Sequence, residues 1–166
     1  MHPRNKFLYE FPSDSAVKLA RSLIDQNLKV GLCHGCFDVF HFGHAIHLSE
    51  SRKASDVLIV SITADKHVNK GKDRPIFSSH QRASVLAEIR CVDYILINHS
   101  ETAEGLIEIF RPAMLFKGAD YEGVEHPGLN LEKSAAERFG GVLRYTTGDR
   151  YSSTEVLRRM RLGDST

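Results

Sequence analysis

The stretch KVGLCHGCFDVFHFGHAIHL, residues 29–48, decides the fold, because a short apolar run passes through a loop directly into a helical pattern. Residues 29–33 are typical of a strand buried on both faces, and residues 43–53 predict a helix. The same order recurs along the chain. Further strands are expected at 56–63, 92–97, 113–117 and 141–145, and further helices at 14–26, 79–90, 101–110, 130–139 and 153–161. This alternation predicts an α/β fold, a Rossmann-like doubly wound sheet of about five parallel strands with helices on both faces.

Several helix boundaries carry local start or stop signals. The expected signals are capping boxes at Ser78-x-x-Gln81 and Ser152-x-x-Glu155, a simple N-cap at Ser100, and a helix stop at Gly140-Gly141. Each of them ends or begins one of the predicted helices, which supports the division of the chain given above.

Length and charge bound the kind of protein. The 166 residues predict a single domain over 1–166, with an N-terminal helix at about 14–26 and a core at about 28–161. Lys and Arg number 22 against 21 Asp and Glu, so the net charge is +1, and no block of five like charges occurs. This balance argues against a nucleic-acid polymer or a membrane surface as partner.

The compartment follows from what the chain lacks. No apolar run is long enough to span a membrane, and the first residues lack the apolar core of a secretory signal. The three cysteines are too few for a disulfide framework. We therefore expect a cytoplasmic protein.

Histidine is the unusual component of the composition. Four of the nine histidines, His34, His41, His44 and His47, lie within fourteen residues that lead from the first predicted strand into the helix that follows it. In a doubly wound sheet, ligands bind outside the carboxyl ends of the strands. The loop that carries these histidines is therefore the expected functional site.

Three interpretations of this loop compete with a catalytic one. Cys33-x-x-Cys36 with nearby histidines suggests zinc, but Cys33 lies inside the predicted strand and the two thiols should point in different directions. A redox dithiol normally opens a helix, in an order of elements that this chain does not have. For His34 and His47, packing and function remain equally open.

His41 and His44 favour a functional interpretation. A helix N-terminus presents free N–H groups and the positive end of the helix dipole, which attract phosphate, and Gly43 lets a ligand approach the backbone. The chain has neither the dinucleotide GxGxxG motif nor the Walker GxxxxGK[ST] motif. A phosphate would therefore be held by a third kind of turn.

The segment Gly35-Cys36-Phe37-Asp38-x-x-His41-x-Gly43-His44 resembles the GxFDxxHxGH signature of the cytidylyltransferase-like nucleotidyltransferases. Four further matches follow in the family's order: Lys70-Gly71-Lys72-Asp73-Arg74-Pro75, Arg90-Cys91-Val92-Asp93, Phe116-Lys117-Gly118-Ala119-Asp120-Tyr121 and Tyr151-Ser152-Ser153-Thr154. The resemblance covers about residues 29–158. It is strongest to the heptose 1-phosphate adenylyltransferase domain, with glycerol-3-phosphate cytidylyltransferase close behind.

The resemblance implies transfer of a nucleotidyl group from ATP or CTP to a sugar phosphate or polyol phosphate, with release of pyrophosphate. Because the acceptor phosphate is already a nucleophile, catalysis reduces to positioning and to neutralising charge. His41 and His44 would donate hydrogen bonds to the phosphates, and Lys70, or else Lys72, would cover them. Arg90 would either contribute to the site or form an ion pair with Asp93.

The resemblance also implies a full set of binding residues. The catalytic set is His41, His44, Lys70 and Arg90; the nucleotide-binding set is Gly35, Cys36, Phe37, Gly43, Lys72, Lys117, Gly118, Asp120, Ser152, Ser153 and Thr154; and the acceptor-binding set is Asp38 and His34. Mg²⁺ would be held mainly through the phosphates, with Asp38 as the candidate protein ligand. The expected partners are these small molecules, and a homodimer is open.

Two departures bear on the substrates. The run from Thr146 to Ser152 lacks the arginine that the cytidylyltransferases for glycerol phosphate and choline phosphate carry, which favours ATP over CTP. His34 stands where many heptose enzymes have asparagine, so the acceptor stays open. The rival hypothesis is a module of the same fold that binds nucleotide or a partner without turnover, and the chain is equally compatible with being one domain of a longer fused protein.

Overall fold

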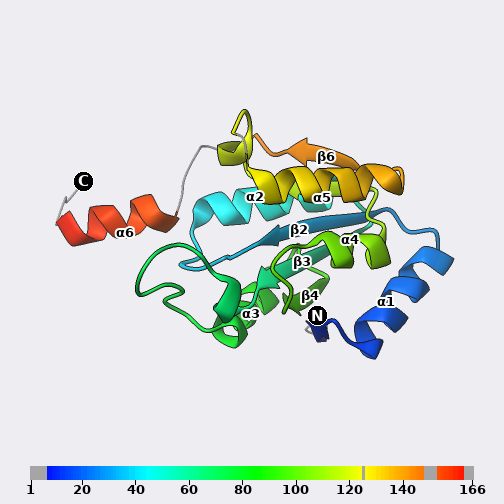
Figure 1. Ribbon diagram of the computed structural model, residues 1–166, viewed down its shortest axis with the longest axis horizontal. Coiled ribbons are helices and arrows are strands. Elements are labelled where there is room, and N and C mark those ends of the chain that lie inside the picture. Colours follow the sequence, from blue (N-terminus) through cyan, green and yellow to red (C-terminus); the bar gives the residue numbers. More distant parts are fainter. Residues whose placement is uncertain (1–6, 125, 148–152, 163–166) are drawn as a thin grey trace.

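The computed structural model describes residues 7–124, 126–147 and 153–162, which form one parallel sheet flanked by helices (Figure 1). The strands are β1 (Phe7–Phe11), β2 (Val30–Gly35), β3 (Val57–Thr63), β4 (Tyr94–Asn98), β5 (Met114–Lys117) and β6 (Val142–Tyr145), in the spatial order β1-β4-β3-β2-β5-β6. All neighbouring pairs are parallel. The predicted α/β doubly wound fold is confirmed, and the sheet has one strand more than expected.

The additional strand is β1, at the edge of the sheet. It pairs with β4 from Phe7 opposite Tyr94 to Phe11 opposite Asn98. Along it Leu8 is exposed, Glu10 is exposed and Phe11 is buried, so only alternate side chains face the core. The sequence prediction sought continuous apolar runs, which identify strands buried on both faces and miss an edge strand of this kind.

Six α-helices are described, and five of them cover the two faces of the sheet. They are α1 (Asp14–Asp25), α2 (Phe42–Lys53), α3 (Ser79–Ala87), α4 (Glu104–Phe110), α5 (Pro127–Arg138) and α6 (Ser153–Leu162), with short 3-10 turns at Asp65–His67 and Ala119–Tyr121. Helices α1, α4 and α5 pack on one face, and α2 and α3 pack on the other. Neighbouring residues of β2 therefore enter different cores. Leu32 belongs to the core between the sheet and α1 and α4, and Cys33 belongs to the core between the sheet and α2 and α3.

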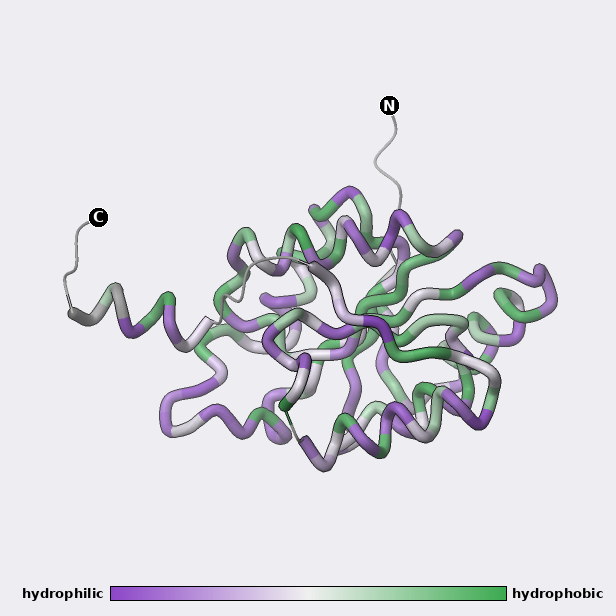
Figure 2. The backbone as a smooth tube through the Cα atoms, turned by 90° about the horizontal axis from the view of Figure 1, so that it is seen from above, coloured by the Kyte–Doolittle hydropathy of each residue, from purple (hydrophilic) through white to green (hydrophobic). Residues whose placement is uncertain are grey.

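Hydropathy follows this layering. The central strands are the most continuously apolar part of the chain, and the surrounding helices alternate between apolar and polar residues (Figure 2). Among the described residues, no helix combines the length and the apolar character that crossing a membrane would require.

Two of the predicted helix boundaries are confirmed. Ser78 and Gln81 form the reciprocal capping box at the start of α3. After α5 the chain turns at Gly140, whose φ of +77° lies in the left-handed region that glycine adopts without strain. The second predicted capping box depends on Ser152, which lies outside the described residues.

Two other predicted boundaries are wrong. Helix α4 begins at Glu104 with Ala103 as its N-cap, and the backbone N–H of Ser100 instead donates to the side chain of Asn98. Helix α5 begins at Pro127, three residues earlier than predicted, because proline suits the first helical position and His126 caps the helix through its ring.

The order of the strands fixes where a ligand would bind. From β2 the chain proceeds to β3 and β4 on one side, and then returns to place β5 and β6 on the other side of β2. The carboxyl ends of β2 and β5 therefore lie next to each other at the switch point, where doubly wound sheets bind ligands. Helix α6 lies beyond this end of the sheet, apart from the other helices (Figure 1).

Candidate functional site

A cavity opens at the switch point, and we call it the histidine cavity. Its walls come from the carboxyl ends of β2, β5 and β6, the first turn of α2, the loop after β3 and the start of α6. It is lined by His34, Gly35, Cys36, Phe37, His41, Gly43, His44, His47, Lys70, Phe116, Lys117, Gly118, Ala119, Asp120, Tyr121, Thr146 and Ser153. Most of the residues predicted from the sequence for the site thus gather around one space.

His41 is the N-cap of α2, with extended backbone angles. Both nitrogens of its ring are shielded from solvent, and neither has a hydrogen-bond partner among the described residues. A shielded polar group without a partner is unfavourable by about 1–3 kcal/mol. Because the ring lines the histidine cavity, a ligand in that cavity is the natural partner.

The tautomer of His44 is fixed by the backbone. Its Nδ1 accepts a hydrogen bond from the backbone N–H of His41 at 3.3 Å, so in the neutral ring the proton lies on Nε2. Burial first, and then the neighbouring His41, His47 and Lys70, lower the pKa of His44 to about 3. At neutral pH the ring is therefore an uncharged donor.

Three aromatic rings hold His44 in place. The ring centroids of His41 and His44 are 3.9 Å apart, and Phe37 and Phe40 contribute contacts at 5.3 and 5.4 Å. Packing of this kind restricts the rotamer of the ring, so its Nε2–H has a defined direction. The two histidines thus act as one preorganised pair.

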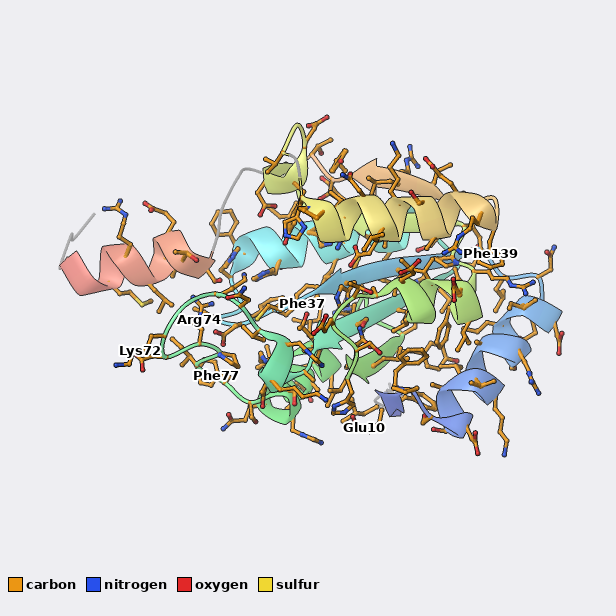
Figure 3. The ribbon with its side chains drawn as sticks, viewed as in Figure 1. Glu10, Phe37, Lys72, Arg74, Phe77 and Phe139 are labelled. Carbon is orange, nitrogen blue, oxygen red and sulfur yellow. The ribbon has the colours of Figure 1, made fainter. Side chains whose placement is uncertain are left out.

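The first turn of α2 and the loop after β3 add positive potential to the histidine cavity. Gly43 lines the cavity at the helix start, where N–H groups and the helix dipole favour an anion. Lys70 lines the same cavity and is otherwise exposed to solvent. Lys72 is exposed, does not line the cavity, and points away from the molecule at the tip of its loop (Figure 3). Of the two predicted lysines, Lys70 is the one in reach of a ligand.

A second cavity adjoins the first, and we call it the α5 cavity. The two share His34, Gly35, Cys36, Lys70, Lys117 and Tyr121. The α5 cavity adds the loops after β3 and β4 and the start of α5, with Thr63, His67, Val68, Asn69, Glu101, Thr102, His126, Gly128, Leu129 and Glu132. Two cavities therefore meet at the carboxyl end of β2.

Lys117 lies between the two cavities with its charge neutralised. Its Nζ is 2.6 Å from Oε2 of Glu132 and donates to the backbone oxygen of His34 at 3.2 Å. It also lies 5.5 Å from the centre of the Tyr121 ring. The side chain is 7% exposed, so this ammonium is part of a buried ion pair and not a free cation for phosphate.

Comparison with known proteins decides the family. The family model described as cytidylyltransferase-like matches residues 32–159. The chain belongs to the cytidylyltransferase-like family. Proteins called bifunctional protein HldE are similar: that of Aliarcobacter butzleri is 38% identical over 79% of this chain, that of Nitratiruptor sp. 33% identical over 96%, and that of Campylobacter curvus 41% identical over 75%. The chain spans 28%, 33% and 27% of the length of these relatives.

Solved structures agree on the fold. A lipopolysaccharide core biosynthesis protein from Thermoplasma volcanium has a TM-score of 0.60 at 22% identity, covering 75% of this chain and 99% of that one. A pantoate-beta-alanine ligase from Francisella tularensis has a TM-score of 0.59 at 18% identity, covering 89% of this chain and 69% of that one. The cytidylyltransferase-like chain thus shares its architecture with proteins of very different sequence.

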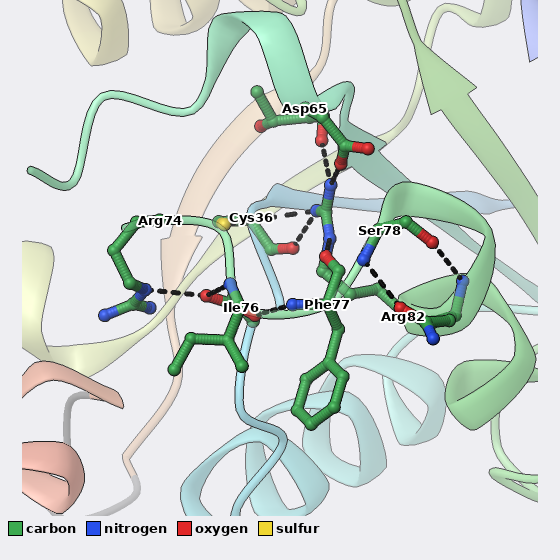
Figure 4. A network of polar contacts seen from close by, with 10 residues as sticks. Cys36, Asp65, Arg74, Ile76, Phe77, Ser78 and Arg82 are labelled. Atoms are coloured by element: carbon green, nitrogen blue, oxygen red, sulfur yellow. Dashed lines mark hydrogen bonds and ion pairs between the residues drawn. The ribbon is translucent and has the colours of Figure 1, made fainter. Parts of the chain in front are cut away.

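Asp38, which the sequence predicts as an acceptor-binding residue or Mg²⁺ ligand, is engaged by groups of the protein itself. Its carboxylate is buried and accepts hydrogen bonds from Arg74 Nε at 2.6 Å and from the backbone N–H groups of Ile76 at 2.9 Å and Phe77 at 3.1 Å. Figure 4 shows Arg74, Ile76 and Phe77 converging on this point. Arg74 also donates to Ser153 Oγ at 3.1 Å. Asp38 therefore holds the loop after β3 against the loop between β2 and α2, and Arg74 links the loop after β3 to α6.

Burial alone would raise the pKa of Asp38, but these hydrogen bonds and the charge of Arg74 outweigh it and lower the pKa. The carboxylate is thus ionised and occupied. The neighbouring backbone is strained, because Phe37 and Val39 have φ values of +51° and +55°, which are unfavourable for residues with a side chain, above all a β-branched one. The Asp38 contacts hold this loop in its unusual conformation.

The structure does not bring Arg90 to either cavity, whereas Arg82 is a buried arginine that contacts the backbone of Cys36 beside both cavities. Arg90 is exposed and does not line either cavity, while Asp93 pairs with Arg52 at 3.0 Å. Arg82 on α3 is buried, and its guanidinium donates to the backbone oxygens of Cys36, Thr63 and Phe77 and to the carboxylate of Asp65 (Figure 4).

Sequence reasoning missed Arg82, although a signal was present. Arg82 lies four residues before the buried Leu86 and three after the buried Ser79, so it occupies the inward face of its helix. A charged residue on such a face requires partners, and here they are the ends of two strands and the lysine-bearing loop. Arg82 therefore joins the segments after β2 and β3 without lining either cavity.

The remaining predicted residues differ in whether they line the histidine cavity. Ser153 is buried at the start of α6 and lines the histidine cavity, whereas Thr154 is exposed and does not. Ser152 lies outside the described residues. His47 also lines the cavity, with its Nδ1 2.9 Å from Thr146 Oγ1.

A metal centre on the cysteines finds no support in the geometry. Burial raises the pKa of the Cys33 thiol to about 12, and this thiol donates to Ser51 in the core, while Cys36 faces the cavities. Within the described ranges, no group of three or more histidine, cysteine or acidic residues is arranged to hold a metal ion. Because Asp38 is occupied as well, the described residues do not fit a protein-held Mg²⁺ cage.

Proposed function

We propose that this chain transfers a nucleotidyl group from ATP or CTP to a sugar phosphate or polyol phosphate, giving a nucleoside-diphosphate sugar or polyol and pyrophosphate. The proposal rests on the cytidylyltransferase-like family and on the HldE relatives. The single observation that carries it is the meeting of the two cavities at the carboxyl end of β2, with Lys70 lining both.

A transfer between two substrates needs two binding spaces that meet at the reacting atoms. In the proposal the nucleoside triphosphate occupies the histidine cavity, beside the anion-attracting start of α2. The acceptor occupies the α5 cavity with its phosphate at the junction. An oxygen of that phosphate attacks the α-phosphorus, the bond from the α-phosphorus to the bridging oxygen breaks, and pyrophosphate leaves with the electron pair of that bond.

The chain's own groups would stabilise the charge that moves in this step. His44 would donate its Nε2–H to a phosphate oxygen, and the unpartnered ring of His41 would provide a second contact. Both rings are neutral donors at physiological pH, because burial lowers the pKa of each. Lys70, on its loop fastened by Asp38, would add the positive charge.

Mg²⁺ enters the proposal with the nucleotide and not as a resident metal. When bound to the triphosphate it neutralises phosphate charge. The protein's contribution is positioning by the helix start, the histidine pair and Lys70. The proposal gives Asp38 no part in holding the ion.

The test is pyrophosphate release in the presence of Mg²⁺. The wild type is assayed with ATP, CTP, GTP and UTP against heptose 1-phosphate, mannose 1-phosphate, glycerol 3-phosphate and phosphocholine, which also decides between ATP and CTP and identifies the acceptor. The variants His41→Ala and His44→Ala should keep their fold and lose a factor on the order of 10²–10³ in turnover with the best pair.

The matched control is His80→Ala, because His80 is an exposed histidine that lines neither cavity. It should keep wild-type turnover. Near-wild-type rates in His41→Ala or His44→Ala would contradict the proposed roles. Nucleotide binding without pyrophosphate from any pair would favour the non-catalytic module.

A further inference from the structure

Glu132 is a buried carboxylate with unused hydrogen-bonding capacity at the floor of the α5 cavity. Its side chain is 6% exposed, and the residue projects from α5. Its Oε2 lies 2.6 Å from the Nζ of Lys117 in an ion pair, and no other described residue donates a hydrogen bond to that oxygen. A carboxylate offers about four acceptor positions, so several of them are available to a ligand.

His34 faces the same carboxylate across a gap. The distance from His34 Nε2 to Glu132 Oε1 is 3.9 Å, which is too long for a direct hydrogen bond. A hydroxyl group between them would accept from one and donate to the other. The other ring nitrogen of His34 is engaged with Ser61 at 3.0 Å, which holds the ring in this orientation.

The charge of this floor favours a neutral ligand. The negative charge of Glu132 is balanced by Lys117 at 2.6 Å, and burial, together with Lys117, lowers the pKa of His34 to about 4, so that the ring is neutral. A cationic amino-alcohol head group would meet an already neutralised carboxylate. Sugar or polyol hydroxyls need only donors and acceptors, which the floor supplies.

We propose that Glu132, held by Lys117 and paired with His34, is the residue that selects a polyhydroxylated acceptor by bonding one of its hydroxyl groups. This inference rests on the proposed function, because it assigns the α5 cavity to the acceptor. It goes beyond that function in naming the residue that sets acceptor specificity, and this residue lies outside the signature motifs.

The experiment compares acceptors that differ by one hydroxyl. The probes are mannose 1-phosphate and its four monodeoxy analogues, each tested for turnover with the preferred nucleotide and for binding by calorimetry. In the wild type, removal of the hydroxyl that Glu132 bonds should lower kcat/KM by about 10- to 100-fold, as expected for a hydrogen bond to a charged group. In Glu132→Gln the same removal should cost less than about threefold, and the KM for the nucleotide should be unchanged.

The matched control is Glu137→Gln on the same helix, where the glutamate side chain is 56% exposed. It should keep the wild-type preference. If Glu132→Gln lowers kcat/KM equally for every acceptor and keeps the full deoxy penalty, Glu132 is only the counter-ion of Lys117 and the proposal is overturned. Because loss of that counter-ion can prevent folding, Glu132→Asp serves as the second variant: it keeps the charge but moves the carboxylate oxygens away from the ligand. It should also lose the preference for the acceptor that carries the hydroxyl over its deoxy analogue.

The two proposals fail differently. Absence of pyrophosphate from every pair overturns the proposed function, and calorimetry with the same sugar phosphates then still tests Glu132. If the wild type turns over every deoxy analogue with a kcat/KM within about threefold of that for mannose 1-phosphate, the role of Glu132 is overturned and the proposed function is not.

Discussion

Replacement of Asp38 by asparagine distinguishes a residue that holds the loops together from a residue that binds substrate. In Asp38→Asn the amide oxygen can replace only one carboxylate oxygen. If it keeps the contacts of Arg74 and Ile76, the new NH₂ group faces the N–H of Phe77, donor against donor. The guanidinium of Arg74, whose side chain is 7% exposed, also loses its counter-charge.

The cost follows from these contacts. Breaking a buried ion pair by removing one partner costs about 3–5 kcal/mol, and an unsatisfied buried N–H costs about 1–3 kcal/mol. Because the amide keeps part of the first interaction, we expect a loss of about 3–5 kcal/mol in the free energy of unfolding in total. For a domain of this size that corresponds to a fall of about 10 °C in Tm.

Urea denaturation and limited proteolysis provide the assay. Asp38→Asn should be less stable by the stated amount and should be cut faster between residues 68 and 77, because its loop is released. Asp73→Asn is the control, since Asp73 is exposed in the same loop. If Asp38→Asn stays within about 1 kcal/mol of the wild type while acceptor binding disappears, Asp38 is a ligand-binding residue and the account of the loop is wrong.

Three further changes test other parts of the structure. Lys70→Ala should lower turnover at least tenfold, whereas Lys72→Ala should stay within about threefold of the wild type; equal effects in steady-state kinetics would reject the distinction. Because the folded pKa of His34 is about 4, below its usual 6.5, its contribution to stability is complete above pH 6.5 and is lost as the pH falls towards 4. Between pH 7 and pH 5 the wild type should lose about 2 kcal/mol in free energy of unfolding through this group, as measured by urea denaturation. If the free energy of unfolding of His34→Gln depends on pH as steeply as that of the wild type, this assignment is refuted. Gly141→Ala should destabilise by about 1–3 kcal/mol, because a Cβ there would lie 2.3 Å from the oxygen of Pro112; a thermal melt equal to the wild type would contradict this contact.

The parts of the fold that the sequence predicts correctly are those with a local cause. Buried strands such as β3 are continuous apolar runs, and the capping box at Ser78 is complete within four residues. Strand β1 is half exposed at the sheet edge, so its short pattern resembles that of a loop. The early start of α5 depends on Pro127 and on the ring of His126, which act as a cap only once the loop before them is in place.

In the site, too, residues with a local cause are predictable and residues that depend on distant partners are not. The positions of His41 and His44 on the cavity wall are predictable, because they depend only on the start of a single helix. Asp38 meets Arg74 from 36 residues away, and Lys117 meets the backbone of His34 from 83 residues away. No local pattern distinguishes such residues from surface charges, since only the assembled sheet brings their partners together.

The most direct measurement of the central claim is phosphorus NMR of the wild-type chain with Mg²⁺, the preferred nucleoside triphosphate and the best acceptor phosphate. The account predicts that each acceptor consumed yields one pyrophosphate and one product whose two phosphorus atoms are joined through an oxygen. Formation of nucleoside diphosphate with inorganic phosphate, or an unchanged spectrum with every nucleotide and acceptor, would contradict it.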